Sequence, residues 1–152
     1  GGDLPKAPAE GAPRFAVRAA QDPGTRSNPG PPLPRIQIVK GWLEGGEARE
    51  KVYDVAGGDN GASVDTATCE RKGKGAAQLC SVWRDPDFDA GENAFYYARV
   101  LENPSCRWNQ RQCIALPEDA RPNTCQKSPV PRTIQERLWT SPTWYEAPMD
   151  AS

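Results

Sequence analysis

Prolines and glycines are spread along almost the whole of this chain, and they constrain its fold more than any other feature. The 152 residues include 16 prolines and 14 glycines, residues that disfavour helix interiors and occupy turns. The apolar residues between them come in short runs rich in β-branched and aromatic side chains, which are typical of strands. We therefore predict short strands joined by long loops, with enough chain for a single core.

The predicted strands follow one another without a helical period between them. The clearest strand is 35–43, which the Gly45-Gly46 turn joins to a hairpin partner at 49–55. A strand at 94–101 is apolar or aromatic on both faces, as in a central strand covered on both sides. Further strands are expected at 14–19, 62–68, 80–83 and 134–145. Together they predict an all-β fold, an immunoglobulin-like antiparallel β-sandwich with long Pro- and Gly-rich loops.

The chain divides into three parts. Residues 1–13 have prolines among small side chains and are expected to form a linker or an edge segment. Residues 14–146 are expected to form a single β-sandwich domain, in which 103–132 is a long cysteine-containing excursion. Residues 147–152 are a tail. The first residues do not resemble a natural N-terminus, so we expect this sequence to be part of a longer protein.

Five cysteines in a chain of this length indicate an oxidising compartment, so we expect a periplasmic or secreted protein. The favoured pairs are Cys69–Cys80 and Cys113–Cys125, each closing a short loop for about 3 kcal/mol in the chain-entropy model. Cys106 would then be a free thiol, with Cys106–Cys113 as the competing pair. Zinc is disfavoured, because no two cysteines have the spacing of zinc ligands.

Histidine is absent from the sequence, which removes the usual general base near neutral pH and the commonest metal ligand. No nucleophile–histidine pair or nucleotide-binding glycine pattern is present, and Cys106 has no base to activate it. The net charge of −1 predicts no nucleic-acid partner. No apolar run approaches the roughly 20 residues of a membrane span. We therefore expect a folded chain without a catalytic site or a cofactor of its own.

Three aspartates at alternate positions, Asp85, Asp87 and Asp89, have a spacing that calcium loops use. The glycine and glutamate of an EF-hand loop are missing, so a solvated turn is the favoured alternative.

The five tryptophans suggest a carbohydrate-binding module as a second hypothesis, because aromatic faces stack on sugar rings. Tryptophan in small β-domains more often fills a core or an interface.

Polar side chains adjoin aromatic ones at 107–108 and 135–139. Glu136 and Arg137, together with Arg99, are expected to form a partly buried ion pair, with a role at a substrate pocket or domain interface as the alternative. We take Arg107, Trp108, Glu136 and Arg137 as candidates for an interface or cleft.

Six blocks of the chain resemble one protein family in the same order. The blocks are Gly1–Pro5 (GGDLP), Arg35–Trp42 (RIQIVKGW), Glu50–Val55 (EKVYDV), Phe95–Pro104 (FYYARVLENP), Cys106–Trp108 (CRW) and Ile134–Pro142 (IQERLWTSP). They resemble the C-terminal portion of domain-of-unknown-function family 3604. These are large, commonly exported bacterial proteins, whose N-terminal part is similar to the polymerase-and-histidinol-phosphatase type of metal-dependent phosphoesterase.

The resemblance implies that a histidine-rich site for a divalent metal lies upstream of Gly1. It implies no catalytic residue in this chain. Leu138 departs from the family pattern, which implies a small residue before Trp139.

We expect a non-catalytic C-terminal accessory domain of an exported bacterial metal-dependent hydrolase. The domain would pack on its own N-terminal catalytic domain and shape a cleft for a small-molecule substrate. The alternative is a free-standing carbohydrate or cell-surface binding module. A third reading is a structural cap that stabilises its neighbour without touching substrate.

Overall fold

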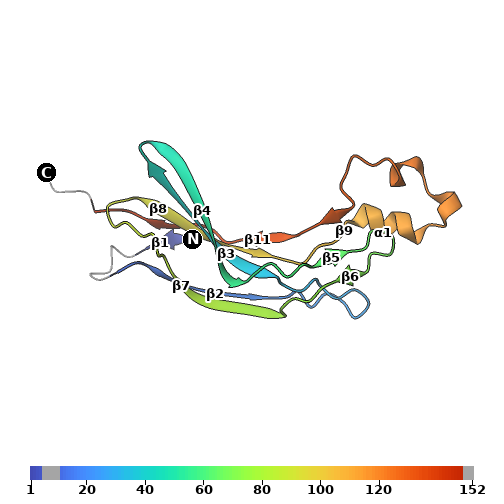
Figure 1. Ribbon diagram of the computed structural model, residues 1–152, viewed down its shortest axis with the longest axis horizontal. Coiled ribbons are helices and arrows are strands. Elements are labelled where there is room, and N and C mark those ends of the chain that lie inside the picture. Colours follow the sequence, from blue (N-terminus) through green and yellow to red (C-terminus); the bar gives the residue numbers. More distant parts are fainter. Residues whose placement is uncertain (5–10, 149–152) are drawn as a thin grey trace.

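The computed structural model describes residues 1–4 and 11–148 and shows an elongated, mostly β molecule (Figure 1). Residues 5–10 of the predicted segment 1–13 and residues 149–152 of the predicted tail lie outside the described residues. Gly2–Asp3 form strand β1, which pairs in parallel with a strand from the other end of the chain, β12 (Thr143–Tyr145). No helix in the described part of the chain is long and apolar enough to cross a bilayer.

A long hairpin organises the major sheet. Strand β3 (Arg35–Glu44) and strand β4 (Glu47–Gly57) pair antiparallel along their whole length, with a bulge next to Ile36. Gly45 and Gly46 have φ of 60° and 85°, a left-handed conformation that glycine adopts without steric cost. The predicted hairpin and its turn are thus confirmed.

Strand β8 (Ala94–Leu101) lies at the centre of the major sheet, as predicted. The expectation that both of its faces are covered is wrong, because β2 and β7 pack on only one face. Strand β8 pairs on one side with β3 and on the other with both β12 and β11 (Arg137–Trp139). The strand expected over 134–145 is divided into these two pieces, since Pro142 between them has no N–H for a ladder. The path through the sheet is β1-β12-β8-β3-β4, with β11 beside β8.

The second layer contains two antiparallel strands, β2 (Arg14–Ala20) and β7 (Gln78–Arg84). Both were expected in shorter form from the sequence. Their inward side chains meet one face of the major sheet, where Phe15 contacts Tyr96 and Trp83 contacts Tyr53. The structure therefore confirms the predicted all-β, sandwich-like fold.

The core lies between these two layers. Its fully buried members are Ile38, Ala94, Tyr96 and Tyr145. Partly buried side chains from both layers pack against them, including Phe15, Val17, Trp83 and Phe88.

The excursion 103–132 contains helical structure that the sequence did not predict. Strand β9 (Ser105–Cys106) leads into helix α1 (Trp108–Ala115) and the 3-10 helices η1 (Glu118–Ala120) and η2 (Asn123–Cys125). The chain then returns through β10 (Thr133–Ile134), which pairs with β9. This region forms one end of the long axis in Figure 1, next to strands β5 (Ser63–Val64) and β6 (Arg71–Lys72).

Two disulfides hold this end together. Cys113–Cys125 joins α1 to η2 and confirms one predicted pair. The predicted pair Cys69–Cys80 is wrong, because Cys69 bonds Cys106 instead. The free cysteine is therefore Cys80, and neither a free Cys106 nor the competing pair Cys106–Cys113 is correct.

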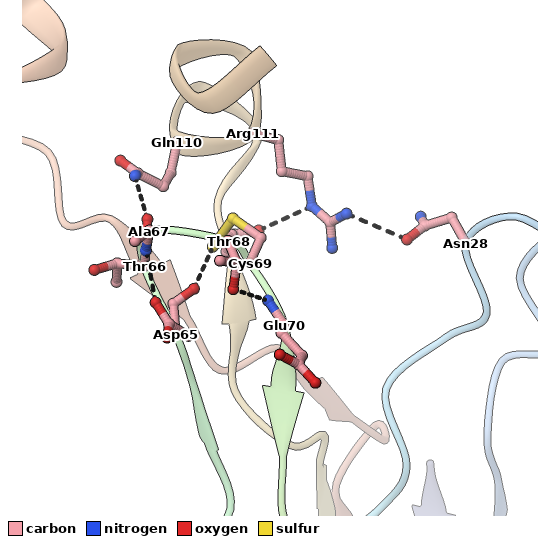
Figure 2. The surroundings of a disulfide bond; sticks show 10 residues. Asn28, Asp65, Thr66, Ala67, Thr68, Cys69, Glu70, Gln110 and Arg111 are labelled. Carbon is pink, nitrogen blue, oxygen red and sulfur yellow. Dashed lines mark hydrogen bonds between the residues drawn. A yellow bond between two sulfur atoms is a disulfide. The ribbon is translucent and has the colours of Figure 1, made fainter. Parts of the chain in front are cut away.

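The location of each cysteine explains the error. Cys80 lies on β7 opposite Arg18, with its side chain exposed on the outside of the second layer. Cys69 follows β5 in a turn with φ of 59°, and the pairing of β5 with β6 places that turn beside the buried Cys106 of β9. Figure 2 shows two further ties from α1 to neighbouring loops: Gln110 donates to the Thr66 carbonyl at 2.5 Å and Arg111 donates to Asn28 at 3.3 Å. Tertiary contacts therefore hold the short helix in place.

Candidate functional site

The major sheet has one face that the second layer does not cover, which we call the outer face. Residues directly opposite on paired strands share a face, so the strand register assigns its members. The outer face includes Arg35, Gln37, Val39, Gly41, Leu43, Glu50, Val52, Asp54, Phe95, Tyr97, Arg99, Arg137, Trp139 and Trp144. The residues between them on each strand point toward β2 and β7.

The outer face carries large apolar side chains that remain open to solvent. Leu43 is 62% exposed, Trp139 56% and Trp144 49%. The Phe95 ring lies 5.2 Å from that of Trp144 and covers Gly41, where a Cβ would overlap it. An aromatic ring over a strand glycine restores the packing that the missing side chain would provide.

A shallow groove of about 680 Å³ runs over this part of the outer face. The outer-face side chains Leu43, Phe95 and Trp144 supply its apolar wall. Polar side chains also line it: Asp3, Arg49, Glu50, Asn93 and Glu146.

The other end of the outer face, at the start of β3, carries polar side chains that are linked by hydrogen bonds. Arg35 pairs with Asp54 at 3.1 Å, and Gln37 donates to the same carboxylate at 2.7 Å. Arg99 donates from Nε to the Gln37 side-chain carbonyl at 2.8 Å. The expected ion pair of Arg99 with Glu136 and Arg137 is therefore wrong, since cross-strand neighbours on the same face satisfy Arg99 first.

The four interface or cleft candidates do not lie together. Arg107 and Trp108 lie at the start of α1, where Trp108 is 70% exposed. Glu136 and Arg137 are exposed residues at β11, beside the middle of the molecule. By strand register Arg137 shares the outer face with Trp139. Glu136 and Arg137 both also line a different groove, next to β2.

Asp85, the first of the three calcium candidates, is buried against a lysine. Its carboxylate lies 2.9 Å from Lys40 Nζ, and both side chains are at most 3% exposed. Tyr96 also donates to Asp85 at 2.7 Å. Burial, with a further contribution from Asp85, raises the pKa of Tyr96 far above its ordinary value. Tyr96 therefore keeps its proton and acts as a hydrogen-bond donor to Asp85.

Asp87 repeats this arrangement nearer to the surface. Lys51 and Tyr53 both donate to its carboxylate, and the hydrogen bond from Lys51 does most to lower the pKa of Asp87. Burial raises the pKa of Tyr53, and its bond to Asp87 adds to the effect. The main-chain carbonyl of Asp87 accepts from Lys40 at 2.7 Å. Lysines of the chain thus engage two of the carboxylates that calcium would need.

Asp89 is used differently, because it accepts from the Gly91 N–H at 2.8 Å and closes a turn. The three aspartates do not converge on one point, and residues 1–4 and 11–148 contain no cluster of three or more ligands suited to a metal ion.

Sequence reasoning did not identify the buried Lys40 as the partner of Asp85, and it did not place Leu43 and Trp144 together on the outer face. The alternation of β3 assigns Lys40 and Leu43 to opposite faces, but it does not say which face is covered. Pairing of β12 with β8 then brings Trp144 beside Phe95 across 49 residues of sequence.

The comparisons with known proteins bear on the whole chain. Residues 1–147 match the family model described as "Protein of unknown function (DUF3604)". The chain belongs to this family. No curated protein and no solved structure matches it. For this DUF3604 chain, the expected family is thus confirmed.

Proposed function

We propose that this chain is a non-catalytic, immunoglobulin-like C-terminal accessory domain of an exported bacterial metal-dependent hydrolase of the phosphoesterase type. Its outer face packs on the N-terminal catalytic domain of the same protein, in the periplasm or outside the cell. The divalent metal and the small-molecule substrate belong to that upstream domain. The resemblance to the family supports the existence of an upstream catalytic domain. The two disulfides support a location in the periplasm or outside the cell.

The observation that carries this proposal is the exposure of Leu43, Trp139 and Trp144 on one face of one sheet. Contiguous exposed apolar surface with a polar border marks interaction sites in soluble proteins. The chain of Arg35, Asp54 and Arg99 supplies such a border and would fix the orientation of the partner. Arg137, beside Trp139, is the candidate that would reach the edge of the substrate cleft.

Substitutions in the full-length protein test this assignment. Trp144→Ser and Trp139→Ser remove exposed side chains from the outer face, and Trp108→Ser removes the more exposed Trp108 from α1 as a control. We expect the two outer-face variants to unfold the accessory and catalytic domains in separate steps, whereas the control unfolds like the wild type. If all three variants behave alike, the outer face is not the interface.

Hydrolysis of phosphate and sulfate esters separates a cleft wall from a cap. With metal supplied, Arg137→Ala is expected to change kcat/KM per folded molecule if the domain borders the cleft. Normal turnover with lowered stability would identify a structural cap instead.

The groove beside Trp144 favours one second candidate, a carbohydrate-binding module. An exposed indole flanked by carboxylates and Asn93 provides a stacking surface and hydrogen-bonding groups for a sugar. A glycan array with the isolated domain tests it, with Trp144→Ala against Trp108→Ala. Binding that only Trp144→Ala abolishes would favour the module over the accessory domain.

A further inference from the structure

The second layer is narrower than the sheet it covers. Among the described strands, only β2 and β7 face the major sheet, and they lie over the part formed by β3, β4 and the beginning of β8. Beyond β2, the inward side chains Ala98 and Val100 of β8 and Leu138 of β11 line an open groove. Leu138 is 60% exposed there, although it points to the same side of the sheet as the core.

The groove follows the edge of β2. Its larger part, of about 500 Å³, is lined on one side by the consecutive residues 16–20, and consecutive residues line a space only along a strand edge. A second part of about 370 Å³ continues along residues 14–17 and shares Ala16, Val17, Ala98 and Thr140 with the first. Together they extend along all seven residues of β2.

Among the residues that the structure describes, the backbone along this edge has no partner strand. All ladder pairs of Arg14–Ala20 are with β7, and no other backbone hydrogen bond in the described chain involves these residues. Strand β11, on the far side of the groove, pairs only with β8. A free strand edge presents a row of N–H and C=O groups that can template another strand.

The groove also has a distinct charge at one end. Its floor is apolar, with Leu33, Ile36 and Val100, whereas Glu102 and Glu136 lie where β2 ends. Burial raises the pKa of Glu102, the nearby Glu136 and Asp22 raise it further, and the charge of Arg71 offsets part of this rise. Neither glutamate belongs to an ion pair in the part of the chain that the structure describes. A cation at this end would relieve their repulsion.

We propose that this groove accepts an extended polypeptide segment, which adds to the free edge of β2 as a third strand of the second layer. The segment has small or β-branched side chains facing the apolar floor and a lysine or arginine at the Glu102 and Glu136 end. Main-chain hydrogen bonds to β2 provide affinity, and the floor and the two carboxylates provide selectivity. The groove lies on the opposite side of the major sheet from the outer face, so this inference goes beyond the proposed function.

Peptide titration of the isotope-labelled domain tests the proposal. The probes are the acetylated, amidated octapeptide Lys-Val-Thr-Val-Ser-Val-Thr-Gly and its reversed sequence, which place the lysine for either strand direction. Two controls carry serine in place of the lysine. We expect one lysine peptide to shift the backbone amide resonances of residues 14–20 and to slow their hydrogen exchange.

Two variants locate the site. Leu138→Glu puts a charge on the groove wall, and Val82→Glu puts the same charge on the exposed side of β7, away from the groove. Both side chains are largely exposed, so both variants are expected to fold. Leu138→Glu should weaken binding at least about tenfold, which corresponds to the loss of one well-packed apolar contact, while Val82→Glu should bind normally.

Glu136→Gln removes one of the two carboxylates at the end of the groove. The wild type is expected to bind the lysine peptide about two- to fivefold more tightly than the serine peptide, and the variant should lose most of this difference. The proposal is wrong if no peptide affects the β2 amides at millimolar concentration, or if Leu138→Glu and Val82→Glu bind alike. A dimer of the domain that perturbs the same amides without peptide would overturn the proposed occupant and make it a second copy. Trp144→Ser leaves peptide binding unchanged, so failure here is separable from failure of the proposed function.

Discussion

Lys40 and Asp85 form an ion pair in the interior, between the major sheet and the loop that follows β7. Lys40 also lies over the Trp42 ring, with Nζ 5.5 Å from its centroid. Removing charges from water is costly, and the hydrogen bonds from Tyr96 to Asp85 and from Lys40 to the Asp87 carbonyl offset part of that cost. The pair therefore holds the loop in one position against the sheet.

We predict that Asp85→Asn lowers the free energy of unfolding by about 3 kcal/mol, because Lys40 keeps its charge without a counter-ion. The double variant Lys40→Met with Asp85→Asn should recover much of this loss. Urea denaturation measures both. Glu44→Ala, which removes the exposed partner of Arg49, is the control and should cost less than about 1 kcal/mol. Equal effects of Asp85→Asn and Glu44→Ala would contradict the assigned role.

The raised pKa of Glu102 predicts how the stability of the domain depends on pH. Since its pKa is raised in the folded state, its effect favours folding below the pKa of the unfolded chain and is lost as pH rises through the folded value. Glu102→Gln should therefore be more stable than the wild type at pH 7, with a smaller advantage at pH 4. Thermal unfolding at the two pH values checks the sign. An advantage that grows toward pH 4 would show that Glu102 is held as a favourable carboxylate.

At the scale of elements, the two disulfides do different work. Cys69–Cys106 spans 37 residues and joins the β5–β6 turn to β9, next to the sheet. Cys113–Cys125 spans 12 residues and closes only the helical end of the molecule. The chain-entropy model gives about 4 kcal/mol for the first and about 3 kcal/mol for the second.

We predict that replacing Cys69 and Cys106 with alanine lowers the cooperative unfolding transition of the whole domain. Replacing Cys113 and Cys125 should mainly speed hydrogen exchange within α1 and η2 and leave β3 and β8 protected. Hydrogen exchange with mass spectrometry distinguishes the two. If both variants open the same segments, the helical end is not a separate unit.

At the scale of the whole molecule, the two faces of the major sheet have different surroundings. One face packs on β2 and β7 and contains the core, whereas the outer face leaves Trp139 and Trp144 about half exposed. An exposed substitution away from special backbone positions usually changes stability by no more than about 0.5 kcal/mol. We therefore expect folding not to depend on Trp139 or Trp144.

We predict that Trp139→Ser and Trp144→Ser each leave the stability of the isolated domain within about 0.5 kcal/mol of the wild type. In the full-length protein, these two indoles should lose access to acrylamide while Trp108 keeps it. Fluorescence quenching of single-tryptophan variants measures this access. Equal quenching of all three residues in the isolated domain and in the full-length protein would contradict docking through the outer face.

Local pattern was enough to predict the strands and the central hairpin. Alternation and β-branched residues mark β2, β3, β4 and β8, and Gly45-Gly46 specifies the turn by its backbone freedom. The short helix α1 was not predictable in this way, because its position depends on a disulfide and on Gln110 bonding the Thr66 carbonyl. Those contacts join residues that are far apart in sequence.

The sequence by itself determined the fold class and the family, because these depend on local patterns and on blocks in a fixed order. It favoured the Cys113–Cys125 bridge by the same short-loop argument that favoured Cys69–Cys80, so the tertiary structure had to decide between them. Only the tertiary structure decided that Cys69 meets Cys106, that Asp85 and Asp87 meet lysines, and that Arg99 meets Gln37. The physical reason is that strand register and layer packing choose the neighbour of each side chain. The same register, together with the narrow second layer, leaves the outer face and the groove along β2 open.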